Sequence, residues 1–250
     1  MSGFQLKNYS ASVDSWINSN AYPIYCEEKK KALREIFEFS SVSMIYGPAG
    51  TGKSTFINHV SHFFSNVEKL FLANTHPAID NLKHKVTAAK CDFTTIRKFL
   101  TNTSIKTKYD ILVIDECSAV SNDDMIHILN KAEFSFLLLV GDMYQIESIR
   151  FGNWFSAVRS FLPRTSIYEL TTPYRTSNSL LLKLWERVRS MDEGILELIT
   201  KEGYSAKLDT SVFEPAERDE IILCLNYDGL YGINNINRFL QETNPNTSVS

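Results

Sequence analysis

One glycine-rich stretch constrains the fold of this chain more than any other part of the sequence. It reads Gly47-Pro48-Ala49-Gly50-Thr51-Gly52-Lys53-Ser54-Thr55, and it lies between an apolar run, Val42 to Tyr46, and an amphipathic segment, Phe56 to Phe64. In the order strand, glycine loop and helix, successive backbone N–H groups can turn inward around a phosphate chain. The positive end of the helix dipole points at the same place. The stretch therefore predicts a nucleoside triphosphate site.

The side chains at the end of this stretch suit a triphosphate. Lys53 is placed to reach the β- and γ-phosphates, and the hydroxyl of Ser54 can complete the ligand shell of Mg²⁺. A glycine-rich turn before an ordinary helix is disfavoured, because the full pattern and its context coincide. We expect ATP and Mg²⁺ as cofactors, held by Gly47, Pro48, Ala49, Gly50, Thr51, Gly52, Lys53, Ser54 and Thr55.

Composition limits the class of protein. The chain has 250 residues, of which 44% are hydrophobic and 22% charged, as in soluble globular proteins. Its net charge of −3 shows no overall basic excess that would indicate nucleic acid, although local patches remain possible. The N-terminus is too polar for a signal peptide, and no apolar run is long enough for a membrane span. We expect a cytoplasmic protein without membrane contact.

The cysteines and histidines do not follow the spacing of a metal site. The four cysteines, Cys26, Cys91, Cys117 and Cys224, are scattered and include no C-x-x-C pair. Reduced thiols are therefore expected. The histidines lack ligand spacing with cysteine or carboxylate, so packing or surface roles are expected for them.

Short apolar runs predict a parallel sheet. Strands are expected at 42–46, 70–73, 111–114, 136–140 and 166–170, and segments of helical period at 27–39, 77–86 and 177–189. Fully apolar strands joined by helices are typical of an α/β fold with a parallel β-sheet covered by helices on both faces. Ligands collect at the carboxyl ends of such strands. The predicted fold is that of a P-loop NTPase.

The chain is expected to hold one complete α/β domain and the start of another. The expected parts are a polar N-terminal segment at 1–22, an ATPase domain at 23–191, an acidic, turn-rich linker at 192–219, and the opening of a second domain at 220–250. In this last part we expect a strand at 221–225 and a helix at 229–240.

Two carboxylates follow the predicted strand 111–114. Phosphoryl transfer needs one carboxylate to hold hydrated Mg²⁺ and another group to orient or deprotonate the attacking water. Asp115 fits the first role and Glu116 the second. After the next strand, Gly141-Asp142-Met143-Tyr144-Gln145 offers Gln145 as a polar side chain where the γ-phosphate is expected.

These motifs, taken in order, resemble those of superfamily 1 helicases, and within them the RecD-like branch. The glycine loop, Ala73-Asn74-Thr75-His76-Pro77-Ala78, Asp115-Glu116-Cys117-Ser118, the segment 141–145 and Tyr174-Arg175-Thr176 look like helicase motifs I, Ia, II, III and IV. The resemblance covers about residues 27–190. It implies a RecA-like ATPase domain that acts on single-stranded DNA, with RNA not excluded.

The resemblance also implies a role for individual residues. Lys53, Glu116, Gln145 and Arg175 would be catalytic: Gln145 would sense the γ-phosphate, and Arg175 would neutralise charge in the transition state. The nucleic acid would be held by Thr75, His76, Thr95, Arg97 and Lys98. Basic side chains between 83 and 108 are expected either to contact the strand or to form a solvated face.

Two departures from the family limit the expected activity. The Gln that reads adenine in these helicases is absent, since Glu28-Lys29-Lys30 occupies its place. Motifs V and VI, with a second arginine finger, are also absent. We therefore expect weak ATP binding, slow hydrolysis and no unwinding by this chain alone, with a further helicase domain or partner protein completing the site. The alternatives are an AAA+-type switch or loader that remodels proteins, and a non-catalytic ATP-binding module.

Overall fold

The computed structural model describes residues 12–19, 24, 26–36, 41–144, 152–205, 222–224 and 226–243. Its contacts separate two compact units, residues 1–185 and 186–250, and each is described by itself. The expected domain boundaries near residues 22, 191 and 219 stay predictions.

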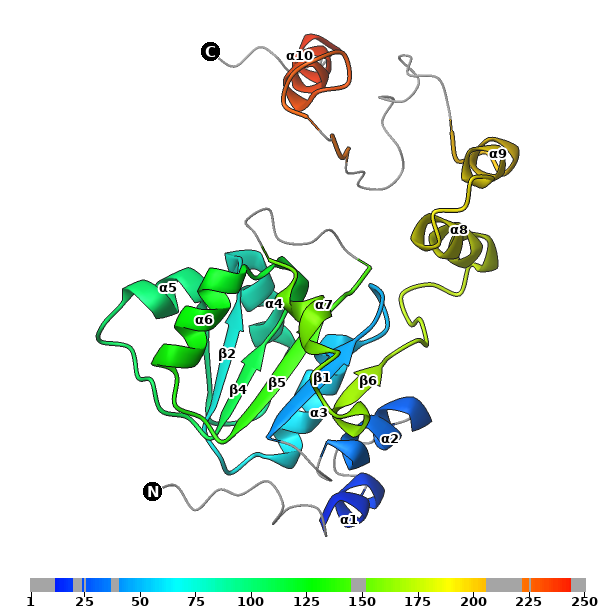
Figure 1. Cartoon of the computed structure of the whole chain (residues 1–250). Helices are drawn as coiled ribbons and strands as arrows, with labels where there is room; N and C mark the ends of the chain where they lie inside the picture. Colours follow the sequence, from blue (N-terminus) through cyan, green and yellow to red (C-terminus); the bar gives the residue numbers. More distant parts are fainter. Residues whose placement is uncertain are drawn as a thin grey trace. The chain divides into compact units, whose positions relative to one another are not determined.

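A six-stranded parallel sheet forms the centre of the first unit (Figure 1). Its spatial order is β3-β2-β4-β5-β1-β6, and every neighbouring pair is parallel. The strands are β1 (Val42–Tyr46), β2 (Lys69–Ala73), β3 (Cys91–Thr95), β4 (Ile111–Ile114), β5 (Phe136–Gly141) and β6 (Ile167–Glu169). The predicted α/β class and parallel sheet are thereby confirmed.

Helices cover both faces of this sheet. Successive side chains of each strand point to opposite faces, so the strands contribute to two apolar clusters, and the helices bury one cluster on each face. Along β5, for example, Leu138 and Val140 belong to one cluster, and Leu137 and Leu139 to the other. The first cluster contains residues of α1 (Val13–Asn18), α2 (Glu27–Glu35), α3 (Lys53–Phe63) and α4 (His76–Lys85). The second contains residues of α5 (Ile96–Thr101), α6 (Asn122–Lys131) and α7 (Trp154–Val158).

The chain reverses its direction across the sheet between β1 and β5. After β1, the next strand is β2, on the side of β4; after β5, the next strand is β6, on the other side of β1. The two connections therefore leave adjacent strands in opposite directions. Such a switch point opens a crevice at the carboxyl ends of the strands, where ligands bind in open α/β sheets.

The sequence expectations miss one strand of the sheet. β3 (Cys91–Thr95) pairs with β2, with Ala73 opposite Thr95. It was not expected because it is an edge strand of mixed burial rather than a continuous apolar run.

Trp16 and α1, in the polar N-terminal segment, pack against the core, and the centroid of the Trp16 ring lies 5.4 Å from that of Phe63.

In the second unit, one expected element is wrong and another was missed. Residues 222–224 form no strand, and the described part of 186–250 offers no other strand with which they could pair. The expected linker contains a helix, α9 (Ile195–Lys201), whose apolar residues recur at helical spacing. The expected helix at 229–240 is present as α10 (Ile233–Thr243), and α8 (Ser179–Arg189) precedes α9.

Helices that combine the length and apolar character of a membrane span do not occur in the described part of the chain.

Candidate nucleotide-binding site

The glycine loop connects β1 to α3 in a conformation that depends on glycine. Gly50 and Gly52 have φ angles of +86° and +81°, in the left-handed region that side chains other than glycine rarely adopt. A Cβ atom on Gly50 would also lie 2.8 Å from Cβ of Arg175, so this segment packs directly against the loop. α3 begins immediately after the loop at Lys53, which directs its first-turn N–H groups to the same cavity.

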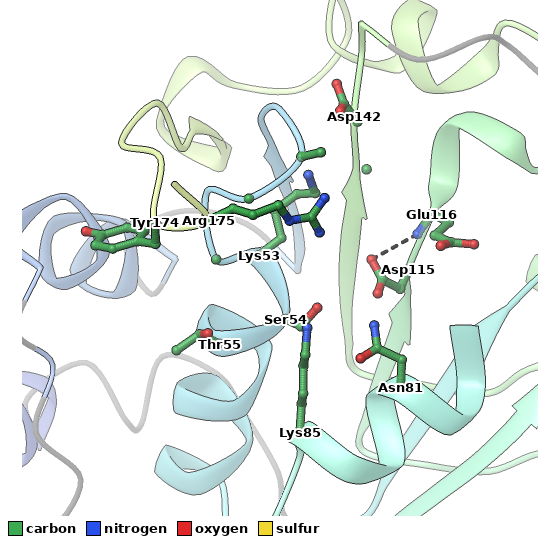
Figure 2. A pocket seen from close by; sticks show the side chains of 14 residues that line it. Lys53, Ser54, Thr55, Asn81, Lys85, Asp115, Glu116, Asp142, Tyr174 and Arg175 are labelled. Carbon is green, nitrogen blue, oxygen red and sulfur yellow. Dashed lines mark hydrogen bonds between the residues drawn. The ribbon is translucent and has the colours of Figure 1, made fainter. Parts of the chain in front are cut away.

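A cavity of about 350 Å³ lies beside the loop at the carboxyl ends of the strands (Figure 2). The lining residues come from the loop, α3, α4, the segment directly after β4, the end of β5 and the segment after β6. They are Ala49, Gly50, Gly52, Lys53, Ser54, Thr55, Asn81, Lys85, Asp115, Glu116, Gly141, Asp142, Tyr174 and Arg175. The structure therefore brings together the glycine loop, the paired carboxylates and Arg175, which lie far apart in the sequence.

The ammonium group of Lys53 is held by the loop itself. Its Nζ donates hydrogen bonds to the carbonyl oxygens of Gly47 at 2.6 Å and Pro48 at 3.0 Å. Burial lowers the pKa of Lys53, while the nearby carboxylates of Asp142 and Asp115 act in the opposite direction. Lys53 is thus a partly buried cation that lines the cavity near two acidic side chains.

Asp115 and Glu116 differ in environment although they are adjacent. Asp115 is buried, and its Oδ1 accepts a hydrogen bond from the backbone N–H of Glu116 at 2.9 Å. Burial raises the pKa of Asp115 to about 6, against smaller opposing effects that include Lys53 and Lys85. Glu116 is exposed and has a φ of 54°, so the backbone turns sharply at the end of the strand.

The donor atoms of this cavity fit Mg²⁺. The hydroxyl of Ser54 and the carboxylate of Asp115 both line it, and oxygen is the ligand that Mg²⁺ prefers. Mg²⁺ at such sites usually keeps several waters and is shared between one or two carboxylates and substrate phosphates. The described residues contain no cluster of three or more His, Cys, Asp and Glu that could hold a metal ion.

Tyr174 and Arg175 reach the cavity because two contacts fix the segment after β6. The backbone N–H of Tyr174 donates to the carbonyl oxygen of Gly50 at 2.8 Å. Oε1 of Glu28, on α2, accepts from the backbone N–H of Thr171 at 2.7 Å and from its hydroxyl at 2.9 Å. Arg175 therefore lines the cavity, and its contact with a nucleotide stays a prediction. Gln145 lies outside the described residues.

Three lining residues were missed by the sequence analysis. Asp142 is buried at the end of β5, where its Oδ1 accepts from the backbone N–H of Tyr144 at 2.9 Å. Its position after an apolar strand was a sufficient signal, since Asp115 was identified in the same way. Asn81 and Lys85 come from α4, and Figure 2 shows both side chains on the Asp115 side of the cavity. No motif marks them.

The residues expected to hold nucleic acid gather at a neighbouring part of the same edge. Thr75 follows β2 and Thr95 ends β3, and these two strands are adjacent. Both threonines cap helices: Thr75 Oγ1 accepts from the N–H of Ala78, and Thr95 Oγ1 from that of Lys98, each at 3.3 Å. The side chains of His76, Arg97 and Lys98 are exposed there.

Much of the positive charge between residues 83 and 108 is paired with carboxylates, although the sequence of this stretch is strongly basic. Lys83 pairs with Asp80, Lys106 with Glu68 and Lys108 with Glu133, so carboxylates from outside the stretch oppose much of its charge. Arg97 and Lys98 have no ion pair among the described residues. The four cysteines form no disulfide in the structure.

A family model described as an AAA domain matches residues 25–208. The chain belongs to this AAA domain family. The match includes every element that lines the cavity, and it agrees with the expected P-loop fold.

Solved helicase structures share the fold at low sequence identity. A structure of Bacteroides sp Pif1 in complex with ADP-AlF4 matches with a TM-score of 0.56 and 16% identity, covering 86% of this chain and 56% of that one. Pif1 helicase from Candida albicans matches with a TM-score of 0.54 and 17% identity, covering 88% and 55%. Bacteroides Pif1 bound to ssDNA matches with a TM-score of 0.50 and 18% identity, covering 71% and 49%.

These matches show that the chain shares its fold with solved Pif1 helicases. The chain spans about half the length of the solved helicases that it matches.

Proposed function

We propose that this chain is the ATP-binding and ATP-hydrolysing motor domain of a superfamily 1 helicase or translocase that acts on single-stranded DNA. The observation that carries the proposal is one cavity in which the glycine loop, Asp115 with Glu116, and Arg175 meet. None of these features would be decisive alone. Together they supply an anion site, two carboxylates and a positive charge, which are the parts that phosphoryl transfer requires.

The triphosphate is placed by the loop and by Lys53. Backbone N–H groups at the start of α3 face the phosphates, and Lys53 exchanges its contacts with the carbonyl oxygens of Gly47 and Pro48 for phosphate oxygens. Ser54 and Asp115 would hold Mg²⁺. When bound, Mg²⁺ neutralises charge on the phosphate oxygens.

Glu116 is proposed as the general base. It accepts a proton from the attacking water, whose oxygen forms a bond to the γ-phosphorus while the bond from that phosphorus to the bridging oxygen of ADP breaks. The products are ADP and inorganic phosphate. Arg175 donates to the γ-phosphoryl oxygens as charge develops on them, and Gln145 is the proposed sensor of that phosphate.

Single-stranded DNA is the proposed partner, along the edge formed by Thr75, His76, Thr95, Arg97 and Lys98. Support comes from the exposure of Arg97 and Lys98 without ion pairs in the described structure. The fold shared with Bacteroides Pif1 bound to ssDNA also supports it. Because the chain spans about half of its structural relatives, we further propose that a second helicase domain or a partner protein completes the site.

ATP turnover by the chain, with and without single-stranded DNA, tests this function. We expect slow turnover that DNA raises and that Glu116→Gln abolishes. Turnover that DNA leaves unchanged would contradict the motor function and would favour a nucleotide switch that acts on protein partners. The Asp80→Asn variant, an exposed acidic residue on α4, is the matched control and should behave as the wild type.

A further inference from the structure

A second cavity of about 470 Å³ adjoins the glycine loop on the side of α2. Its lining includes Cys26, Lys29, Gly52, Thr55, His59 and Tyr174. Gly52, Thr55 and Tyr174 line both this cavity and the one beside the paired carboxylates. The two cavities therefore meet at the glycine loop, within the first compact unit of the chain.

The direction of the phosphate chain places the nucleobase in this second cavity. The γ-phosphate belongs next to Glu116 and Asp142, the end at which water attacks. Figure 2 shows Thr55 and Tyr174 on the opposite side of Lys53 from these carboxylates. A nucleotide whose γ-phosphate faces Glu116 thus extends past Thr55 with its ribose and base, toward α2. The ribose and base also need space beside α2, and the cavity of about 470 Å³ provides it.

Lys29 is a buried cation that faces this space. Its side chain is only 5% exposed, and its Nζ lies 4.1 Å from the centroid of the Tyr174 ring. A methyl group on Gly52 would come within 2.6 Å of the same Nζ, so the ammonium lies directly against the glycine loop. Among the described residues, Nζ of Lys29 has a ring contact but no hydrogen-bond acceptor. The ammonium group can therefore donate to a ligand that enters the cavity.

His59 adds a buried polar atom that has no hydrogen-bond partner among the described residues. Its Nδ1 is buried and makes no hydrogen bond within the described structure. Burial lowers the pKa of His59 to about 4, and the charge of Lys29 acts in the same direction, so the imidazole is neutral at pH 7. The cavity therefore presents a cationic donor together with a neutral ring nitrogen that can accept or donate.

We propose that this cavity binds the nucleobase and that Lys29 selects guanine over adenine. The inference rests on the proposed nucleotide site. Guanine presents the O6 and N7 acceptors side by side, and a lysine ammonium can contact both. At the corresponding positions adenine presents an N6 amino donor beside N7, and an ammonium group has no acceptor to offer that donor. His59 can in turn accept from a ring N–H of guanine.

The test compares equilibrium binding of the non-hydrolysable β,γ-imido analogues of GTP and ATP to the full chain, in the presence of Mg²⁺. We expect the wild type to bind the GTP analogue about tenfold more tightly, the lower part of the range for one good base contact. Lys29→Gln should reverse the preference, because a glutamine amide pairs with N6 and N7 of adenine. Lys31→Gln, an exposed lysine on the same helix, should leave the preference unchanged.

The outcomes separate this inference from the function on which it rests. Equal affinity of the wild type for the two analogues would overturn the proposed selectivity and leave the nucleotide site intact. If Lys29→Gln lost the same factor of affinity for both analogues, the proposed selectivity would also be overturned, because Lys29 would then contact a phosphate rather than the base. Failure of the wild type to bind either analogue would contradict the nucleotide site itself. Comparison of the wild-type affinities does not depend on how well any variant folds.

Discussion

The backbone N–H of Glu116 donates a hydrogen bond to Oδ1 of Asp115 at 2.9 Å, and Glu116 itself has a φ of 54°. This left-handed turn separates two adjacent carboxyl groups into a buried one and an exposed one. A residue other than glycine in this region costs roughly 1–2 kcal/mol, and such strain is common at functional sites. In the proposed mechanism, this turn would position Asp115 for the metal and Glu116 for the attacking water.

Substitutions of Glu116 should therefore separate activity from stability. Glu116→Gln should abolish ATP turnover with little change in the free energy of unfolding, because it keeps the shape and the strained backbone. Glu116→Asn should also abolish turnover but raise that free energy by roughly 0.5–1 kcal/mol, because asparagine tolerates the left-handed region better. Urea unfolding beside a turnover assay measures both. Lower stability of Glu116→Asn than of Glu116→Gln would contradict the strained turn.

Asp115→Asn should stabilise the nucleotide-free protein, and more so at high pH. The pKa of Asp115 is raised from 3.8 to about 6 by burial, so the folded state prefers the protonated carboxyl. That preference stabilises the fold fully below pH 3.8 and is lost as pH rises through 6. Removing the charge in Asp115→Asn should then raise the free energy of unfolding by up to roughly 3 kcal/mol at pH 8, and by about half as much at pH 5.

Urea unfolding at the two pH values measures this effect, with the exposed Asp80→Asn as control. A stability gain that is equal at pH 5 and pH 8 would show that the charge of Asp115 is not the cause. The same protonation predicts the opposite trend for ligand: the affinity for Mg²⁺ and nucleotide together should fall as pH drops below about 6, because Mg²⁺ requires the carboxylate.

Arg175→Ala should lower ATP turnover far more than ATP binding. Arginine fingers contribute about 10³–10⁵ in rate where they act on the transferred phosphoryl group. Alanine retains the Cβ atom that packs against Gly50, so the loop should keep its shape. Arg175→Lys should not restore turnover, since an ammonium cannot replace the planar guanidinium. Arg164→Ala, exposed and outside the cavity, is the control. Equal turnover in Arg175→Ala and the control would remove Arg175 from the mechanism.

Arg97→Ala and Lys98→Ala should each weaken binding of single-stranded DNA and reduce its salt dependence. Losing one phosphate contact lowers the slope of log affinity against log salt by about 0.7. Fluorescence anisotropy over a salt series measures the slope, and Lys31→Ala serves as the control. Slopes identical to the wild type in both variants would place the strand elsewhere.

Thr75 needs a separate test because it caps α4. Thr75→Ala removes the acceptor of the Ala78 N–H and should cost about 1 kcal/mol of stability, whereas Thr75→Ser should retain the cap. If Thr75→Ser binds DNA normally and Thr75→Ala binds weakly only at temperatures where it unfolds, the role of Thr75 is structural. Thermal melts beside the anisotropy assay distinguish the two cases.

The strands that carry the site were predictable because each is a buried apolar run followed by polar residues. β1, β4 and β5 all follow this pattern, and the glycine loop, Asp115 and the Gly141 segment follow from it. β3 was not predictable in this way, since an edge strand need not be apolar on both faces. Nor did residues 222–224 form the expected strand, because an apolar run becomes a strand only beside a partner.

The side chains that enter the site from outside its motifs were not predictable from the sequence. Lys85 and Asn81 line the cavity beside the paired carboxylates because α4 packs beside α3. Lys29 lines the second cavity because α2 lies against the glycine loop. These are contacts between segments far apart along the chain. A single lysine on an amphipathic helix is normally solvated, so only the packing reveals that Lys29 is buried.

The central claim is that the cavity beside the glycine loop binds a triphosphate through Lys53. Isothermal titration of the wild type and Lys53→Ala with Mg²⁺ and ATP tests it most directly, with Lys31→Ala as the control on an exposed lysine. We predict that the wild type and the control bind alike, and that Lys53→Ala binds at least about tenfold more weakly, the effect of one lost charged hydrogen bond. Equal affinity of Lys53→Ala and the wild type would contradict the claim.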